Sequence, residues 1–177
     1  MEISMLDIFR GFVRNYHGLR LEYFDGELTY TKYTNVILNY FLRLGEHIGL
    51  DGELEKNKCD LMWARPGTDT PLMHLEHENE PDLQTVLDEE FVDLRESKAP
   101  LVIGLFYPNS KDAVTEWIDA LREASNWRKE VLFILNPLIY GDDRVIELHG
   151  LLSEGTELKH YRAIVPYLDE PVESLVG

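Results

Sequence analysis

The sequence lacks several features that would each indicate a particular class of protein. It has one cysteine, Cys59, among 177 residues, so no intramolecular disulfide can form and a reducing compartment is expected. No apolar run approaches the roughly 18 residues of a membrane-spanning helix. The opening residues, MEISMLDIFRGF, contain no basic region followed by an apolar stretch, so no secretory leader is expected. These absences predict a cytoplasmic protein with no membrane partner.

Positive charge is also scarce. The chain carries 17 lysines and arginines against 33 aspartates and glutamates, which gives a formal net charge of -16. Such a charge opposes nonspecific binding to nucleic acid, because that affinity comes from neutralising phosphates. Two interpretations stay open. Either the partner is not a nucleic acid, or the acidic surface is a general adaptation, for instance to a salty cytoplasm, and a local basic patch is retained.

The length of the chain suits a single domain. A chain of 177 residues can bury roughly 70% of its unfolded surface and needs no disulfide to hold a core. The sequence shows no internal repeat and no low-complexity linker. We divide the single domain 1–177 into an N-terminal extension (1–33), a core (34–136) and a C-terminal extension of the sheet (137–177).

The N-terminal extension is predicted to be a helix followed by a hairpin. Apolar residues in 5–16 recur at helical spacing. Alternating residues then flank Asp25 and Gly26, and an Asp-Gly pair in that setting predicts antiparallel strands at 19–24 and 27–33. Four aromatic residues lie on this hairpin: Tyr23, Phe24, Tyr30 and Tyr33. Such a surface could form a homodimer or pack against the core.

The first half of the core reads as one helix followed by strands. An apolar stripe predicts a helix from residue 34 to 48, capped by Thr34 or Asn35. The weakly patterned residues 50–58 are consistent with an irregular strand. Residues 59–65 and 71–79 then predict two strands, and the turn-forming PGTDT segment between them indicates a second hairpin.

The second half alternates between helices and buried strands. Helices are expected at 82–96, capped by Asp82, and at 110–128; strands are expected at 101–106, 131–136 and 160–165, while 145–152 fits a strand or a short helix. Strands that are apolar throughout are typical of a sheet covered on both faces. The predicted fold class is therefore α/β, with a mixed central sheet flanked by helices and right-handed crossovers.

One strand carries more ionisable groups than a buried strand should. In LMHLEHE (72–78), alternate side chains share a face, so His74, Glu76 and Glu78 lie on one side of the sheet and His77 on the other. Glu76 and Glu78 are about 7 Å apart along the strand. Their charges repel, and burial would penalise them further unless a cation or another partner stabilises them.

Asp60 on the preceding strand lies across the hairpin from these glutamates. Three carboxylates on adjacent strands form an oxygen-rich site suited to Mg²⁺ or Mn²⁺. Two other interpretations remain. The glutamates could form a solvated row on an edge strand, although the apolar strand at 101–106 opposes this. His74, Glu76 and Glu78 could instead hold Zn²⁺ or Mn²⁺, whereas a single strand histidine is more often structural.

The order and spacing of these residues resemble a known family. Asp60, 15 intervening residues and then Glu76-x-Glu78, on two strands that follow a helix, resemble the restriction-endonuclease-like PD-(D/E)xK nucleases. The succession of helix, strands, helix and strand over about 36–107 is also similar to the core of that family. The resemblance implies that Asp60 and Glu76 bind metal, that Glu78 takes the usual lysine position, and that Glu46 is the accessory helix carboxylate.

The resemblance implies a metal-dependent nuclease that hydrolyses phosphodiester bonds in DNA, with Asp60, Glu76 and Glu78 as catalytic residues and Mg²⁺ or Mn²⁺ as cofactor. Glu78 cannot supply positive charge, so it would act as a ligand or a general base. Lys98, after the next helix, could provide a relocated lysine.

Two alternatives to a nuclease stay open. The chain could be a catalytically inactive protein of the nuclease fold that serves as a binding or regulatory module, which the missing lysine and the acidic surface favour. It could also be an unrelated α/β protein with an acidic metal-binding patch. If DNA is the partner, Lys56, Lys58 and Arg65 flank Asp60 and are the candidate contacts, although they could equally be ordinary solvated charges.

Overall fold

The computed structural model describes residues 4–24, 29–56, 58–80, 82–124, 127–137, 145–154, 157–166 and 174–176. The described strands are β1 (Asp51–Lys56), β2 (Cys59–Ala64), β3 (Pro71–Glu78), β4 (Leu101–Phe106), β5 (Glu130–Leu135), β6 (Val145–Glu154), β7 (Glu157–Pro166) and β8 (Ser174–Val176). The described helices are α1 (Met5–Phe24), α2 (Tyr30–His47), α3 (Leu83–Asp88), α4 (Glu90–Glu96) and α5 (Ala113–Glu123).

The eight described strands form one sheet in the order of the sequence, from β1 to β8. Strands β1, β2 and β3 are antiparallel neighbours, β3, β4 and β5 are parallel, and β5 to β8 are antiparallel again. The parallel pairs are connected through α3 and α4 and then through α5. The mixed sheet and the α/β class predicted from the sequence are therefore confirmed.

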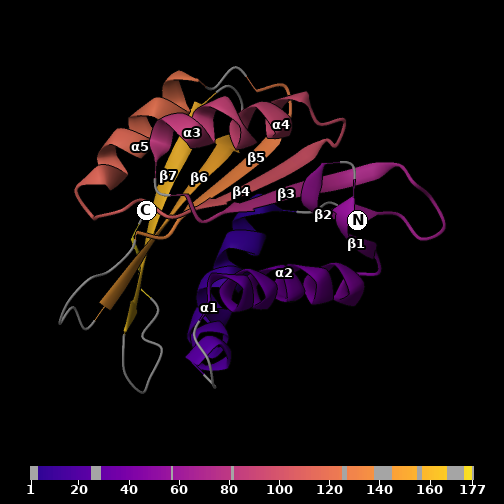
Figure 1. Ribbon diagram of the computed structural model, residues 1–177, viewed down its shortest axis with the longest axis horizontal. Coiled ribbons are helices and arrows are strands. Elements are labelled where there is room, and N and C mark those ends of the chain that lie inside the picture. The colour runs from indigo at the N-terminus through magenta and orange to yellow at the C-terminus, as the bar shows by residue number, and fades with distance from the viewer. Residues whose placement is uncertain are drawn as a thin grey trace.

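Helices cover both faces of this sheet. Figure 1 shows α1 and α2 on one side and α3, α4 and α5 on the other. Neighbouring residues of β4 point to opposite sides, so Ile103 packs in the cluster with Phe12 and Phe41, while Val102 packs in the cluster with Leu94. Because both faces are covered, β4 and β5 are apolar along almost their whole length.

The predicted N-terminal hairpin is wrong, because residues 19–24 lie in α1 and residues 30–33 lie in α2. Phe12, Tyr16 and Leu19 are all buried at helical spacing, whereas Leu21, which completes the strand-like alternation, is 60% exposed. Asp25 lies outside the described residues together with Gly26. A homodimer surface on such a hairpin therefore loses its structural basis.

The start of α2 also differs from the prediction. Thr29 is the N-cap, and its side chain accepts a hydrogen bond from the backbone N–H of Lys32. Neither Thr34 nor Asn35 caps the helix, because both lie inside it. Residues 30–33 are thus part of the helical layer that covers the sheet.

The second half of the core follows the prediction with smaller differences. The carboxylate of Asp82 accepts from the N–H of Thr85 at 2.9 Å, as expected of a cap, but the helix it starts breaks at Glu89 into α3 and α4. Helix α5 is shorter than predicted, and residues 145–152 belong to a strand, β6, rather than a helix. No described helix combines the length and the apolar character needed to cross a membrane.

Candidate carboxylate site

The candidate site lies where β2 and β3 separate. Regular pairing of the two strands includes Leu61 opposite Leu75, and the next pair toward the start of β2 would be Asp60 with Glu76. At this position, contacts between backbone N–H groups and side-chain carboxylates replace the backbone–backbone hydrogen bonds of the strand pair. The N–H of Asp60 points to Glu76 Oε2 at 3.4 Å, and the N–H of His77 donates to Asp60 Oδ2 at 2.7 Å. The structure thus brings Asp60 and Glu76 together between the strands.

Burial dominates the electrostatics of this pair. Glu76 is 4% exposed, and its removal from water, followed by the charges of Asp60 and Glu90, raises its pKa to about 9. Burial also raises the pKa of Asp60, against the hydrogen bond from the His77 N–H. Neither carboxyl forms an ion pair with any residue in the described ranges. At neutral pH Glu76 therefore holds a proton, and a cation that replaced the proton would stabilise the site.

Helix α4 adds carboxylates that the sequence prediction missed. Glu90 lies in its first turn and is half-buried, and burial followed by the charge of Glu78 raises the pKa of Glu90 to about 7. Asp93, one helical turn later, adds to the raised pKa of both Glu76 and Glu90. The sequence contained one signal that could have found them. Glu90 and Asp93 are three residues apart, which places both on one face of the helix that connects β3 to β4.

The two other predicted residues on β3 point to different neighbours. The carboxylate of Glu78 is half-buried, and its Oε1 accepts from the N–H of Glu80 at 2.7 Å. His74 is 6% exposed, and its Nδ1 lies 2.6 Å from Ser97 Oγ, while its Nε2 is buried without a hydrogen-bond partner among the described residues. Glu78 and His74 thus flank Glu76 along the strand, each held by a different loop.

The structure separates Glu46 from this pair. Helix α2 covers the opposite face of the sheet, where Trp63 Nε1 donates to the carbonyl of Phe41. Glu46 is exposed near the C-terminus of α2, close to the Trp63 end of β2, whereas Asp60 is at the other end of that strand. The accessory role that the resemblance implied for Glu46 is therefore wrong for this arrangement.

A pocket of about 420 Å³ opens beside Glu76, between β3 and α4. Its lining includes Lys58, His74, Glu76, Asp93, Ser97 and Lys98. Asp60 and Glu78 do not line it. The pocket brings Lys98, which the sequence suggested as a relocated lysine, to the same cavity as the buried carboxyl of Glu76.

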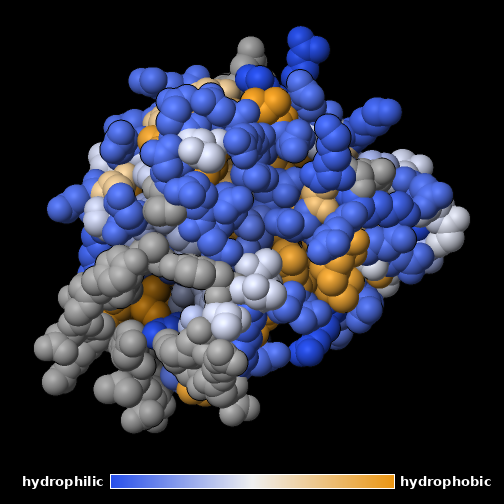
Figure 2. All heavy atoms as spheres, viewed as in Figure 1, coloured by the Kyte–Doolittle hydropathy of each residue, from blue (hydrophilic) through white to orange (hydrophobic). Residues whose placement is uncertain are grey.

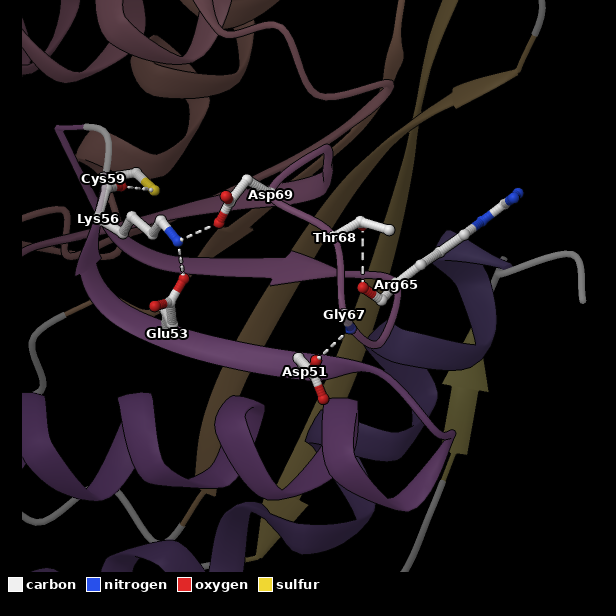
Figure 3. Close-up of polar contacts among 8 residues, drawn as sticks. All are labelled: Asp51, Glu53, Lys56, Cys59, Arg65, Gly67, Thr68 and Asp69. Atoms are coloured by element: carbon white, nitrogen blue, oxygen red, sulfur yellow. Dashed lines mark hydrogen bonds and ion pairs between the residues drawn. The ribbon is translucent and has the colours of Figure 1, made fainter.

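The three predicted DNA contacts have different surroundings. Figure 3 shows the ammonium of Lys56 between the carboxylates of Glu53 and Asp69, and it lies 2.9 Å from Asp69 Oδ1. The side chain of Arg65 extends away from this cluster (Figure 3), and Arg65 does not line the pocket. Lys58 is exposed and does line the pocket. Of the three, Lys58 is the one placed beside Glu76.

Two observations bear on a metal at this site. Within the described part of the chain, no three His, Cys, Asp or Glu side chains form a group arranged to hold a metal ion. The donors that the two adjacent strands bring together are the hard carboxylates of Asp60 and Glu76, with Glu78, Glu90 and Asp93 close enough to shift their pKa values. That set fits Mg²⁺, which commonly binds through one or two carboxylates and keeps several waters.

Comparison of the chain with family models, curated proteins and solved structures finds no match.

Proposed function

We propose that the chain is a metal-dependent nuclease that hydrolyses phosphodiester bonds in DNA, with Asp60 and Glu76 as the ligands of Mg²⁺ or Mn²⁺. The observation that carries the proposal is the pair itself: two carboxyls of adjacent strands, one of them 4% exposed, each directed at a backbone N–H of the other strand and without an ion-pair partner among the described residues. Burial beside Asp60 keeps Glu76 protonated, and a cation bound by both carboxyls could take the place of that proton.

The residues of the chain have distinct roles in this proposal. When bound, the metal would activate a water and polarise the phosphate. The His77 N–H orients the Asp60 carboxylate, and Glu76 supplies the second oxygen ligand. Lys98, across the pocket from β3, supplies the positive charge that Glu78 cannot. The order of a helix, three antiparallel strands, helices and a parallel strand is also consistent with the family resemblance.

The test combines cleavage with metal binding. We expect the protein to cut DNA with Mg²⁺ or Mn²⁺, and Asp60→Asn and Glu76→Gln to abolish cutting. We also expect Mn²⁺ to raise the melting temperature of the wild type at pH 8, because a ligand bound to the folded state alone stabilises it, and to leave both variants unchanged. Glu46→Gln is the matched control, since Glu46 is on the opposite face. If DNA stays uncut across a range of salt and metal concentrations, the proposal is wrong.

A second candidate function is a binding or regulatory module that does not cut. The orientation of Glu78 favours it, because this carboxylate accepts from the Glu80 N–H rather than taking part in the Asp60–Glu76 pair. The net charge of -16 also disfavours a long nucleic acid. Metal-induced stabilisation that Glu76→Gln removes, without hydrolysis of any phosphodiester, would favour this module over the nuclease.

A further inference from the structure

Two histidines meet on the hairpin of β6 and β7, away from the carboxylate site. His149 Nδ1 lies 3.0 Å from His160 Nε2, the ring planes are inclined by 14°, and the ring centroids are 5.2 Å apart. The two nitrogens therefore face each other, edge to edge, in nearly one plane. This is the geometry of an N–H···N hydrogen bond, in which one ring donates and the other accepts. A metal ion does not fit between nitrogens placed in this way, because it would lie about 2.0–2.1 Å from each of them.

This contact limits how many protons the pair can hold. The hydrogen bond needs one proton between the facing nitrogens, and it can form when both rings are neutral or when one ring is an imidazolium. When both rings are imidazolium, both facing nitrogens carry a proton, and two positive charges meet at 3.0 Å. The contact cannot persist in that state, so the closed pair excludes a proton that the separated rings would bind.

Glu147, the carboxylate beside His149, is already neutralised. The guanidinium of Arg162 donates to both of its oxygens, at 2.7 Å from Nη2 to Oε1 and 2.8 Å from Nε to Oε2. Glu147 Oε2 lies 3.8 Å from His149 Nε2, which is too far for a hydrogen bond. Lys111, just before α5, adds a second positive charge near Glu147, and Leu135 of β5, opposite His149, adds none. A charged His149 would therefore gain little from Glu147.

Burial and the neighbouring cations keep both rings neutral. His149 is 7% exposed, and burial followed by His160 lowers its pKa to about 4. Burial also lowers the pKa of His160, followed by the charges of Arg122 on α5 and Arg162 on β7. At neutral pH the pair therefore carries no net charge and keeps one proton between its facing nitrogens.

Helix α5 lies on the same side of this hairpin. Leu151 of β6 and Leu158 of β7 belong to one buried cluster with Trp117 and Leu121 of α5. Leu151 is two residues after His149, so their side chains share a face of the sheet. Figure 2 shows a largely hydrophilic surface over α3 to α5, as expected of helices whose apolar sides lie on the sheet. Opening of the hairpin would therefore loosen α5 as well.

We propose that the contact between His149 and His160 is an acid-sensitive clamp, which is closed at neutral pH and opens in mild acid, loosening β6, β7 and α5 while β1 to β3 stay folded. Separated histidines bind protons below about pH 6.5, whereas the closed pair does not, so the clamp stabilises the hairpin above that pH and fails as pH falls. The equilibrium for opening shifts about tenfold per pH unit for each proton that opening admits. The inference is independent of the proposed nuclease function, because the carboxylate pair lies on β2 and β3.

The first experiment measures local opening of the full chain. Hydrogen exchange is followed by mass spectrometry at pH 7.5 and pH 5.0, with each rate divided by the intrinsic exchange rate at that pH. We expect the amides of β6, β7 and α5 to exchange at least about tenfold faster at pH 5.0 on this scale, because the open state takes up protons that the closed pair excludes. The amides of β1 to β3 should show no comparable change.

The second experiment replaces one ring at a time. His149→Asn and His160→Gln each keep an amide near the facing nitrogen, and an amide oxygen can accept from the remaining ring when that ring is protonated. Both variants should therefore reduce the acid response of the hairpin to less than about threefold. Arg122→Gln removes a positive charge near His160 and should move opening to lower pH. His47→Gln, exposed at the end of α2, is the matched control and should respond as the wild type does.

Three results would overturn the clamp. One is equal protection of β6 and β7 at both pH values in the wild type. Another is a full wild-type acid response in both His149→Asn and His160→Gln, or equal acceleration in every strand and helix, which indicates global acid unfolding. The third comes from nitrogen NMR of the imidazoles, in which we expect both rings to be neutral at pH 6. Titration of both rings near pH 6.5 while the hairpin amides stay protected would show that the closed pair accepts the protons.

Discussion

Glu76 and His77 are neighbours on β3 whose side chains point to opposite faces of the sheet and meet different surroundings. Both are buried, with 4% and 5% of their surface exposed. Burial raises the pKa of Glu76 to about 9 and lowers that of His77 to about 4, so both are uncharged at neutral pH. His77 Nε2 lies 2.7 Å from the hydroxyl of Tyr107, whereas Glu76 is 3.4 Å from the N–H of Asp60.

The His77 face contains a connected polar network. The side-chain amide of Asn136 donates to the hydroxyls of Tyr16 and Tyr33 at 2.6 and 3.0 Å, and the ring of Tyr33 packs against that of Tyr107. Buried hydroxyls that find partners within the protein stabilise the fold and need no ligand. Nδ1 of His77 is an exception, without a partner among the described residues. The contrast teaches that one face of β3 is held mainly by internal partners, while the other keeps carboxyls without an ion-pair partner among the described residues.

The largest expected effect concerns Glu76→Gln and pH. Because the folded state binds the Glu76 proton more tightly than the unfolded state does, the wild type should lose stability as pH rises from about 4.5 to about 9. Glutamine removes this loss. The difference in unfolding free energy between the variant and the wild type should therefore shift in favour of the variant by up to about 4 kcal/mol from pH 5 to pH 8. Each pH unit in this range contributes about 1.4 kcal/mol. Urea unfolding at both pH values measures the difference.

A control separates burial from the loss of one negative charge. Glu22→Gln removes the same charge from an exposed site on α1 and should leave the pH dependence of unfolding close to that of wild type. Equal responses from the Glu22 and Glu76 variants would contradict the assignment of the high pKa to burial at Glu76.

A smaller effect is expected on the opposite face. Tyr107→Phe removes the hydroxyl that bonds His77 Nε2 and leaves a buried nitrogen without a partner, which should cost about 1–3 kcal/mol of unfolding free energy. Urea midpoints measure it. Tyr161→Phe is the matched control, because the Tyr161 hydroxyl, on β7, donates to Glu154 at the end of β6 in an exposed hydrogen bond. If the two variants lose the same stability, the network on the His77 face contributes less than its burial indicates.

The smallest effect concerns the helix beside Glu76. The ammonium of Lys129 donates to the carbonyls of Leu94, Arg95 and Ser97, at the C-terminal end of α4. Lys129→Met should destabilise this end by about 1 kcal/mol and speed hydrogen exchange of the α4 amides, with little change in α1 and α2. Hydrogen exchange followed by mass spectrometry tests this, and uniform acceleration across all helices would contradict a local role.

The sequence predicted the centre of the sheet well because its signals there were local. The apolar runs of β4 and β5, the turn before β3 and the Asp82 cap each report on a few neighbouring residues. Alternation along β3 also correctly placed Glu76 and His77 on opposite faces. The Asp25-Gly26 signal failed because the same apolar residues fit a helix, and only packing on the sheet made Leu19 buried and Leu21 exposed.

The sequence alone therefore determined the α/β class, the faces of β3 and the pairing of Asp60 with Glu76, since these follow from strand periodicity and a short hairpin. Tertiary structure decided which other groups join them. In the folded protein Glu46 lies on the opposite face of the sheet from Glu76, and Glu90 of α4 lies near the carboxyl pair. Lys58 and Lys98 line the same pocket. Such choices depend on how helices pack across a sheet, where residues distant in sequence become neighbours and set the dielectric that a carboxyl experiences.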